Sequence, residues 1–361
     1  MIKNEIRPLT GIRALAAMWV VCLHIEPDII VVFPSLALLH PLFDEGTLGV
    51  DIFFVLSGFV LSMVYKIETF NFKWIKYKGF LVNRLARIYP DYLFCFFLLA
   101  LMIAADHLLG RKSTDLVNYP ISSAGWHLAM MQAWPLVPAT WSNWNAPAWS
   151  VSAEWFAYLL LFPLAIWLIS KSVVKRFSPV FALIILALFV PFAHSSDELY
   201  GFYFVFRITS LFLTGCLMYA FCLTSPSIAQ KLANHLDVIV VGFTATIWFG
   251  AHTTIGYWLI MLAIPVIIVG LTRESSKFAK LLSTPLFCYL GHISYALYLV
   301  HAIAQRMLHV MLPVEKYASG PFYLKLIVLL SYLMFPILLA AGIYHLVEEP
   351  SRLAIRRRFS S

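Results

Sequence analysis

Long apolar stretches separated by short polar ones make up most of the chain. A window of about twenty residues finds ten stretches that are apolar enough to cross a bilayer as helices. They begin near Leu9, Thr47, Pro90, Ala148, Pro179, Tyr203, Leu236, Thr253, Thr284 and Phe322. The pattern predicts an all-α polytopic membrane protein with about ten transmembrane helices. Because no soluble segment is long enough for a second domain, residues 1–361 are predicted to form one integral-membrane domain.

Composition and charge agree with a membrane protein. The chain is 61% hydrophobic and 12% charged, whereas about 25% of residues are charged in soluble domains. Of its 26 Lys and Arg residues, 19 lie at the two ends and in alternate loops. This asymmetry predicts that both termini are cytoplasmic. The net charge of +8 therefore reflects topology and contact with the lipid bilayer, and no nucleic-acid partner is expected.

Two ionisable residues lie inside the first apolar stretch. Arg13 and His24 are eleven residues apart, so on a helix they face the same way, about 16 Å apart along the axis. Charged and titratable groups are costly inside a bilayer, which makes this stripe a functional-site hypothesis. The alternative is that Arg13 snorkels to the surface while His24 bonds a neighbouring helix.

Two carboxylates are predicted at a similar depth. Asp51 lies near the start of the second span and Glu154 near the start of the fourth, so both should share the outer half of the bilayer with His24. A histidine paired with a carboxylate can accept a proton. The alternative is that these polar side chains only join neighbouring helices by hydrogen bonds.

Two further clusters carry candidate chemistry. Ser294, Tyr298 and His301 form one stripe of the ninth span because they are four and three residues apart. Arg84 and Arg87 lie together at the inner end of the third span. They are either an ordinary cytoplasmic anchor or a clamp for phosphate groups, which suit guanidinium forks.

Six of the eleven tryptophans fall within thirty residues: Trp126, Trp134, Trp141, Trp144, Trp149 and Trp155. They form either an interfacial aromatic belt or a surface on which sugar rings stack. The five cysteines have no CxxC spacing, so neither a disulfide framework nor a metal site is predicted.

Six segments occur in a characteristic order along the chain. They are Thr10–Ala14 leading to His24, GVDIFFVLSGFVLS from Gly49, NRLARIYP from Asn83, WSVSAEWFAYLLLFP from Trp149, ISYALYLVH from Ile293, and VEEPSR from Val347. Together they resemble the type-3 membrane acyltransferase family, bacterial enzymes that O-acylate surface and extracellular glycans.

The resemblance implies a donor, an acceptor and site residues. The donor would be a cytoplasmic acyl-coenzyme A, most simply acetyl-coenzyme A, and the acceptor a hydroxyl of a glycan or glycolipid at the outer face of the bacterial cytoplasmic (inner) membrane. His24 corresponds to the family's general base and Glu154 to its fourth-span acid; Arg13, Arg84 and Arg87 correspond to its arginines, expected to hold the donor. Asp51, Trp149, Ser294, Tyr298 and His301 are expected to contact substrate or support the site.

Two questions stay open at this point. Some relatives carry a C-terminal extracytoplasmic hydrolase-like domain, whereas this chain stops at Ser361, so either the membrane domain acts alone or an extracytoplasmic transferase or other glycan-biosynthesis partner completes the reaction. The alternative function is a proton-coupled transporter, which would use the same intramembrane His, Glu and Arg residues. Transporters tend to show paired halves, and no such symmetry is visible in this sequence.

Overall fold

A computed structural model describes residues 5–70, 73–110, 119–135, 137, 144–195 and 200–359. Within these ranges every regular element is helical, which confirms the predicted all-α class. The chain forms two compact units, and α1 (Arg7–Val32) and α15 (Pro285–Met311) each contribute residues to both. The prediction of a single domain stays a prediction.

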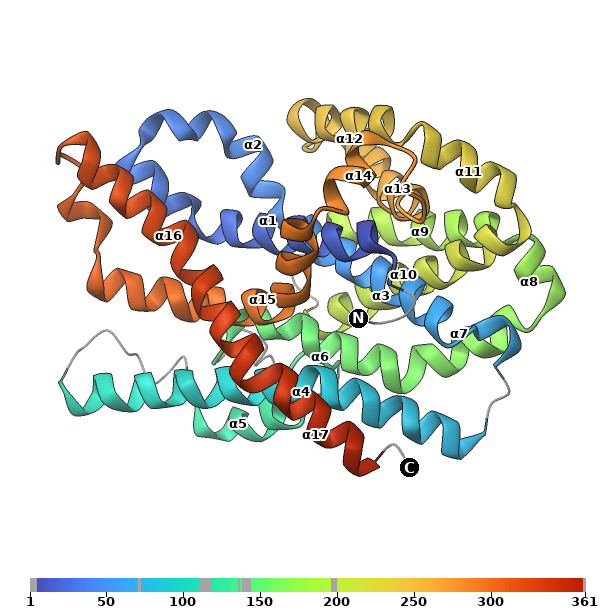
Figure 1. Cartoon of the computed structure of the whole chain (residues 1–361), viewed down its shortest axis with the longest axis horizontal. Coiled ribbons are helices and arrows are strands. Elements are labelled where there is room, and N and C mark those ends of the chain that lie inside the picture. Colours follow the sequence, from blue (N-terminus) through green and yellow to red (C-terminus); the bar gives the residue numbers. More distant parts are fainter. Residues whose placement is uncertain are drawn as a thin grey trace. The chain divides into compact units, whose positions relative to one another are not determined.

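Unit 1 comprises residues 1–23, 41–72 and 157–294. Besides the first parts of α1 and α15, its helices are α2 (His40–Phe43, from Pro41 on), α3 (Leu48–Val64), α7 (Phe162–Ile169), α8 (Ser172–Arg176), α9 (Ser178–Ser195), α10 (Tyr200–Thr224), α11 (Pro226–Asn234), α12 (Leu236–Gly250), α13 (Thr254–Gly270) and α14 (Lys277–Leu282) (Figure 1). A π-helical turn, Ala157–Leu161, precedes α7.

Close packing of α3 against α10 forms the centre of unit 1. A Cβ added to Gly58 would lie 2.0 Å from the Phe212 carbonyl oxygen, and one added to Gly215 would lie 2.0 Å from that of Val55. Only glycine lets two helix backbones approach this closely. The two helices therefore meet at backbone contact on both sides of the crossing.

Unit 2 comprises residues 24–40, 73–156 and 295–361. Besides the second parts of α1 and α15, its helices are α4 (Trp74–Leu108), α5 (Ile121–Leu128), α6 (Trp149–Phe156), α16 (Phe322–Ile343) and α17 (Glu349–Phe359) (Figure 1). Short 3₁₀ turns occupy Pro34–Leu39, Ala146–Ala148 and Val314–Lys316, and a π-helical turn, Tyr344–Glu348, joins α16 to α17.

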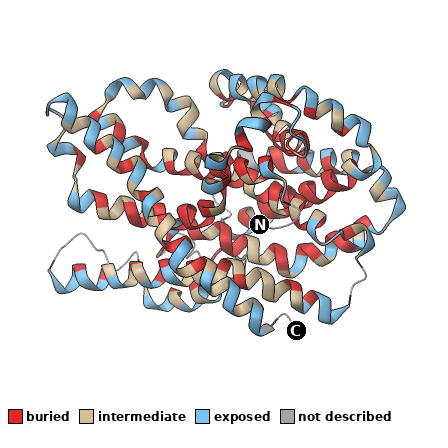
Figure 2. Ribbon diagram, viewed as in Figure 1, coloured by how far each residue is buried: buried red, intermediate tan, exposed pale blue. Residues whose placement is uncertain are grey.

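Seven helical segments of the described chain are long and apolar enough to cross a membrane, or eight if the bent pair α11 and α12 counts as one span. The stretches predicted near Pro179 and Thr253 form shorter apolar helices, Ser178–Pro191 and Thr254–Gly270. Large apolar side chains are exposed, among them Leu108 at 85% and Phe249 at 84%, and exposed positions recur along the helices (Figure 2). Such surfaces suit contact with lipid. The count of ten and the side of the termini stay predictions.

Helix α4 begins well before the span that the sequence predicts near Pro90. It runs for 35 residues from Trp74 to Leu108, which is about 50 Å at 1.5 Å per residue and exceeds a bilayer core of about 30 Å. Lysines lower the hydropathy of its first turns, but they favour a helix. The hydropathy window therefore finds only the apolar part of a longer helix, and Pro90 lies inside it.

Candidate active site

A face of α15 within unit 2 carries polar side chains at Tyr295, Tyr298, His301, Gln305 and His309. Steps of three or four residues keep them on one side of the helix. Partners come from α1, α4 and α6 of the same unit. We call these residues together the polar column: Arg87, Asp91 and Glu154 around Tyr295; Tyr298; His24 and His301; and Asp28, Gln305 and His309.

His24 and His301 bring two imidazole rings together in the middle of the polar column. Their centroids are 4.8 Å apart and the ring planes are inclined by 60°. His301 is fully buried, whereas His24 is exposed. His301 Nδ1 lies 2.7 Å from the Tyr298 carbonyl oxygen. Since a carbonyl only accepts, Nδ1 carries the proton, and the Nε2 lone pair of the neutral ring is buried without a hydrogen-bond partner.

The start of α6 and the residues just before it fix this turn of α15. The Tyr298 hydroxyl donates to the Pro147 carbonyl and accepts from the Ser150 hydroxyl, both at 2.8 Å. Asn145 Nδ2 donates to the Leu299 carbonyl at 2.9 Å. These bonds join parts of the chain some 150 residues apart. They therefore hold the backbone that carries His301.

Buried hydrogen-bond acceptors gather at the same segment. Gln132 Nε2 donates to the Ala148 carbonyl at 3.0 Å, while Gln132 Oε1 and Asn145 Oδ1 are buried without partners. His301 Nε2 is a third such atom. Buried acceptors are nearly always satisfied in folded proteins. Hydroxyl groups of a ligand would supply the missing donors.

Charged residues act on Tyr295, the first residue of the polar column along α15. Its hydroxyl donates to the Ile88 carbonyl at 2.7 Å, and Arg87, Asp91 and Glu154 are the charged side chains that act on it. The Arg87 guanidinium carbon is 5.9 Å from the centre of the tyrosine ring. Glu154, one of the predicted catalytic residues, therefore lies in the polar column.

Arg84 and Arg87 have different surroundings. Arg87 forms a salt bridge with Glu348, which is fully buried in the π-helical turn before α17. Asp91, also fully buried, has two carboxylate oxygens without hydrogen-bond partners. Arg84 is half-buried, and its Nε has no partner. Of the two predicted phosphate ligands, Arg87 is thus already held by a carboxylate.

Asp28 organises the other end of the polar column. It accepts from Gln305 Nε2 at 2.6 Å, and it lies 2.8 Å from His309 Nε2. Gln305 Nε2 also donates to the main-chain carbonyl of His24 at 2.8 Å. Pro27, which has no N–H, lies inside this turn of α1. The backbone at His24 is therefore tied to α15.

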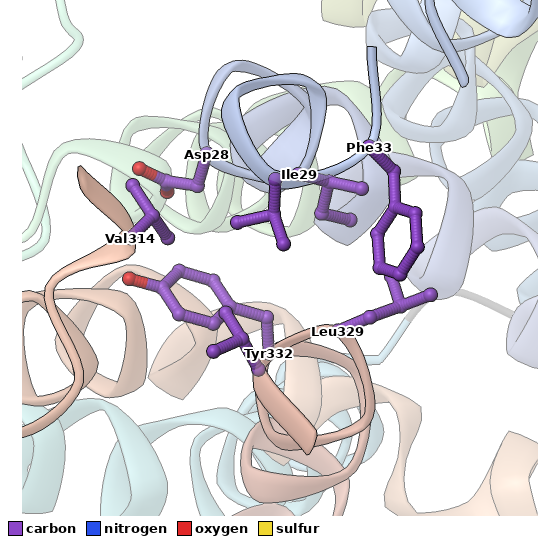
Figure 3. A pocket seen from close by; sticks show the side chains of 8 residues that line it. Asp28, Ile29, Phe33, Val314, Leu329 and Tyr332 are labelled. Carbon is purple, nitrogen blue, oxygen red and sulfur yellow. The ribbon is translucent and has the colours of Figure 1, made fainter. Parts of the chain in front are cut away.

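A small pocket adjoins Asp28 (Figure 3). Ile29 of α1 and Phe33, the residue after α1, face Leu329 and Tyr332 of α16 across it, with Asp28 at one edge. Its lining is mainly apolar. The carboxylate, bonded to α15, is thus covered on this side by packed side chains.

In unit 1, Asp51 is paired with Arg207. Arg207 Nε and Nη2 donate to the two carboxylate oxygens at 2.7 and 3.0 Å, and both side chains are buried. Arg207 Nη1 also donates to the Tyr203 hydroxyl at 3.2 Å. No role was assigned to Arg207 from the sequence. A charge in a span needs a partner, and that requirement could have linked it to Asp51.

The remaining predicted residues take the following places. The Ser294 hydroxyl donates within α15 to the Gly291 carbonyl at 2.8 Å. Arg13 in α1 and Trp149 at the start of α6 are half-buried. Sequence reasoning missed Asn145, Gln132, Asp91 and Glu348, although the last two are ionisable residues in or beside apolar stretches.

Two tryptophans of the Trp-rich segment direct their indole N–H groups into the protein. Trp134 Nε1 donates to the Ser152 carbonyl at 3.2 Å, and Trp144 Nε1 to the Ser123 hydroxyl at 3.1 Å. Trp126 is 38% exposed, and Trp141 lies outside the described residues. At least two of the six therefore have a packing role.

Unit 1 also contains an apolar cavity of about 300 Å³. Residues of α1, α3, α12 and α13 line it, among them Ile12, Ile52, Phe243 and Ile264. Its chemistry suits a hydrocarbon and offers no group for proton transfer. Among the described side chains, no cluster of three or more His, Cys, Asp and Glu residues could hold a metal ion.

Comparisons with known proteins agree with the family resemblance. A family model described as an acyltransferase domain matches residues 7–345. The acyltransferase MdmB of Streptomyces mycarofaciens is 33% identical over 46% of this chain and 41% of its own length. The O-acetyltransferase OatA of Staphylococcus aureus is 27% identical over 81% of this chain and 49% of its own.

The match does not extend over the whole of these relatives. A putative O-acetyltransferase of Staphylococcus aureus is 22% identical over 95% of this chain and 57% of its own length, so the chain spans about half the length of the curated relatives it matches. No solved structure matches significantly. The apolar helices indicate a multi-pass membrane protein, and the family match over nearly the whole chain shows that it belongs to the type-3 membrane acyltransferase family.

Proposed function

We propose that this protein transfers an acyl group, most simply acetyl, from cytoplasmic acyl-coenzyme A to a hydroxyl of a glycan or glycolipid at the outer face of the bacterial inner membrane. Membership of an acyltransferase family supports acyl transfer, and two similar proteins are named O-acetyltransferases. The observation that carries the proposal is the pair of imidazole rings, 4.8 Å apart, in the polar column of unit 2.

His24 is the proposed general base. It removes the proton of the acceptor hydroxyl as the oxygen attacks the thioester carbonyl carbon. The carbon–sulfur bond then breaks, and the coenzyme A thiolate takes the proton from the imidazolium. A thioester is already activated, so the protein mainly positions the reactants and moves one proton.

Carboxylates in the polar column favour the charged intermediate state of His24. Glu154 acts electrostatically on Tyr295 of this column, and its negative charge would stabilise an imidazolium at His24. This electrostatic stabilisation applies only while the proton is on the imidazole. Glu154 therefore assists proton transfer as a charge-balancing residue.

The donor would bind along the basic first part of α4. Arg84 is the proposed phosphate ligand, because its neighbour Arg87 is engaged by Glu348. Arg87 then completes the inner end of the site by fixing α4 to the turn before α17. The pantetheine arm would run past Arg13, eleven residues before His24 in α1, whose guanidinium can donate to the amide carbonyls of the arm.

The acceptor would bind at the segment 145–150, which includes Trp149 and, together with Gln132, presents buried acceptor atoms. Sugar hydroxyls could donate to Asn145 and Gln132, and the indole of Trp149 offers an apolar face for a pyranose ring. Tyr298 holds this segment against α15. Asp51 and Ser294, which lie in unit 1, would support the helices of that unit.

The test uses purified protein in lipid nanodiscs with labelled acetyl-coenzyme A and a bacterial glycolipid mixture. We expect label to appear on an acceptor hydroxyl, and His24→Ala to lower transfer at least about a hundredfold. His24 is exposed, so this variant should unfold at nearly the wild-type temperature. Transfer above a tenth of wild type in His24→Ala would contradict the general-base role.

The transporter alternative predicts a different result in the same preparation. Wild-type protein would consume no thioester, and vesicles containing it would show His24-dependent uptake driven by a proton gradient. That outcome would replace the proposed function.

A further inference from the structure

We propose that His301 is the hydrogen-bond partner of the His24 ring during proton transfer, so that the two side chains act as a His–His pair. His301 is then a positioning residue for the general base. This inference rests on the acyl-transfer function for its kinetic consequences, but the pairing itself can be observed without turnover.

The reaction creates a need for an acceptor beside His24. A protonated imidazole has two N–H donors. One of them holds the proton that passes from the hydroxyl to the leaving thiolate. The other requires an acceptor, because an unsatisfied donor on a charged group lowers the stability of that state.

His301 offers this acceptor in a defined form. The Tyr298 carbonyl at 2.7 Å fixes the proton on His301 Nδ1, so Nε2 carries a lone pair. That atom is buried and without a partner. A histidine in this tautomer can accept from the neighbouring ring through Nε2.

The two rings are already close enough for such a bond. An in-line N–H···N bond of about 2.9 Å places imidazole centroids roughly 5 Å apart. The observed separation is 4.8 Å, with the planes inclined by 60°. The ring separation is therefore within the range of an N–H···N bond.

Two sets of contacts keep the pair in this geometry. Gln305 donates to the His24 carbonyl, which fixes the backbone of the base. Tyr298 and Asn145 anchor the turn that carries His301 to the segment before α6. Side chains on both sides of the pair are thus held by long-range hydrogen bonds, as positioning of a catalytic group requires.

Two substitutions separate the acceptor role from a structural one. In His301→Asn, the amide can keep the donor to the Tyr298 carbonyl but loses the acceptor toward His24. In His301→Gln, the longer side chain can place its carbonyl oxygen near the position of Nε2 but loses the bond to Tyr298. The pairing predicts that Gln is the better replacement, and a structural role predicts that Asn is.

The kinetic measurement compares acetyl transfer by both variants at saturating acceptor. We expect His301→Asn to lower kcat about a hundredfold with the KM for acetyl-coenzyme A within about twofold of wild type, while His301→Gln keeps at least a tenth of kcat. His292, on the same helix but in unit 1 and beside Glu5, provides the control His292→Asn, which should leave kcat unchanged. If Asn preserves kcat better than Gln, the pairing is wrong.

A spectroscopic measurement tests the pairing without acyl transfer. Protein labelled with nitrogen-15 in histidine should show His301 with a protonated Nδ1 and an unprotonated Nε2, assigned by the loss of its signals in either variant. His301→Asn should change the His24 tautomer populations, and His301→Gln should leave them close to wild type. A wild-type His301 protonated at Nε2 would overturn the inference, even if the variants fail to fold.

The two measurements distinguish the two proposals. If wild type transfers no acetyl group but shows the expected tautomers and their response to His301→Asn, the acyl-transfer function fails and the pairing stands. If transfer occurs and His301→Asn changes neither kcat nor the His24 signals, the function stands and the pairing fails.

Discussion

Arg84 and Arg87 lie on successive turns of α4, yet their surroundings predict different effects of substitution. Arg84→Ala should weaken the binding of acetyl-coenzyme A about ten- to a hundredfold, because a charged hydrogen bond contributes about 1.5–3 kcal/mol. A pantetheine thioester lacks the nucleotide phosphates, so its KM should be unchanged in this variant. Measuring KM for both donors checks this result, and equal losses for both would show that Arg84 does not bind phosphate.

Substitution of Arg87 should act through stability instead. Arg87→Ala leaves Glu348 buried without its partner, and breaking such a pair typically costs about 3–5 kcal/mol. Thermal unfolding in detergent should therefore move to lower temperature, with activity toward both donors reduced in parallel. If the double variant Arg87→Ala with Glu348→Gln regains the wild-type unfolding temperature, the unpaired Glu348 charge is the cause of the instability. A loss of activity with acetyl-coenzyme A but not with the pantetheine thioester would instead assign Arg87 to phosphate binding.

At the scale of single residues, the sequence located titratable residues but not their partners. His24 and His301 each stood out as polar residues in apolar stretches, and the helical period placed His301 beside Tyr298. Their contact joins helices that lie far apart in the sequence, which no local pattern encodes. The pairs Asp51–Arg207 and Arg87–Glu348 escaped notice for the same reason.

At the scale of elements, the α3–α10 crossing gives a test of packing. Gly58→Ala should destabilise the protein, because the added Cβ would lie 2.0 Å from a backbone oxygen of α10 and the helices would have to separate. Gly242→Ala on α12 is the matched control, since nothing lies within 4 Å of its added Cβ, and alanine favours a helix over glycine by about 1 kcal/mol. Thermal unfolding of both variants measures the difference; equal midpoints would contradict the close approach.

Element types were predictable here and element ends were not. Each predicted apolar run coincides with a helix of the described chain, although seven helical segments, or eight with the bent pair, are long enough to cross a membrane. The start of α4 at Trp74 was missed since its first turns are basic, and the π-helical turn at Ala157–Leu161 was missed because hydropathy does not depend on backbone hydrogen-bond pattern.

At the scale of the whole molecule, the number of crossings can be measured. On a background without the native cysteines, Ser319→Cys should react with an impermeant maleimide in intact spheroplasts. Arg176→Cys and Lys231→Cys should react only after lysis, as the charge pattern predicts; none of the three positions is buried. Labelling of Lys231→Cys in intact spheroplasts would mean that α9, one of the short helices, does not cross.

The Asp51–Arg207 pair has a consequence for synthesis. The two residues are 156 positions apart, and at roughly 5–20 residues per second the ribosome needs on the order of ten seconds or more to reach the second from the first. During that interval α3 has entered the membrane with its carboxylate but without its arginine. The nascent chain therefore passes through a stage in which α3 must be shielded by the insertion machinery, and a ribosomal pause between the two residues would prolong its exposure to membrane proteases.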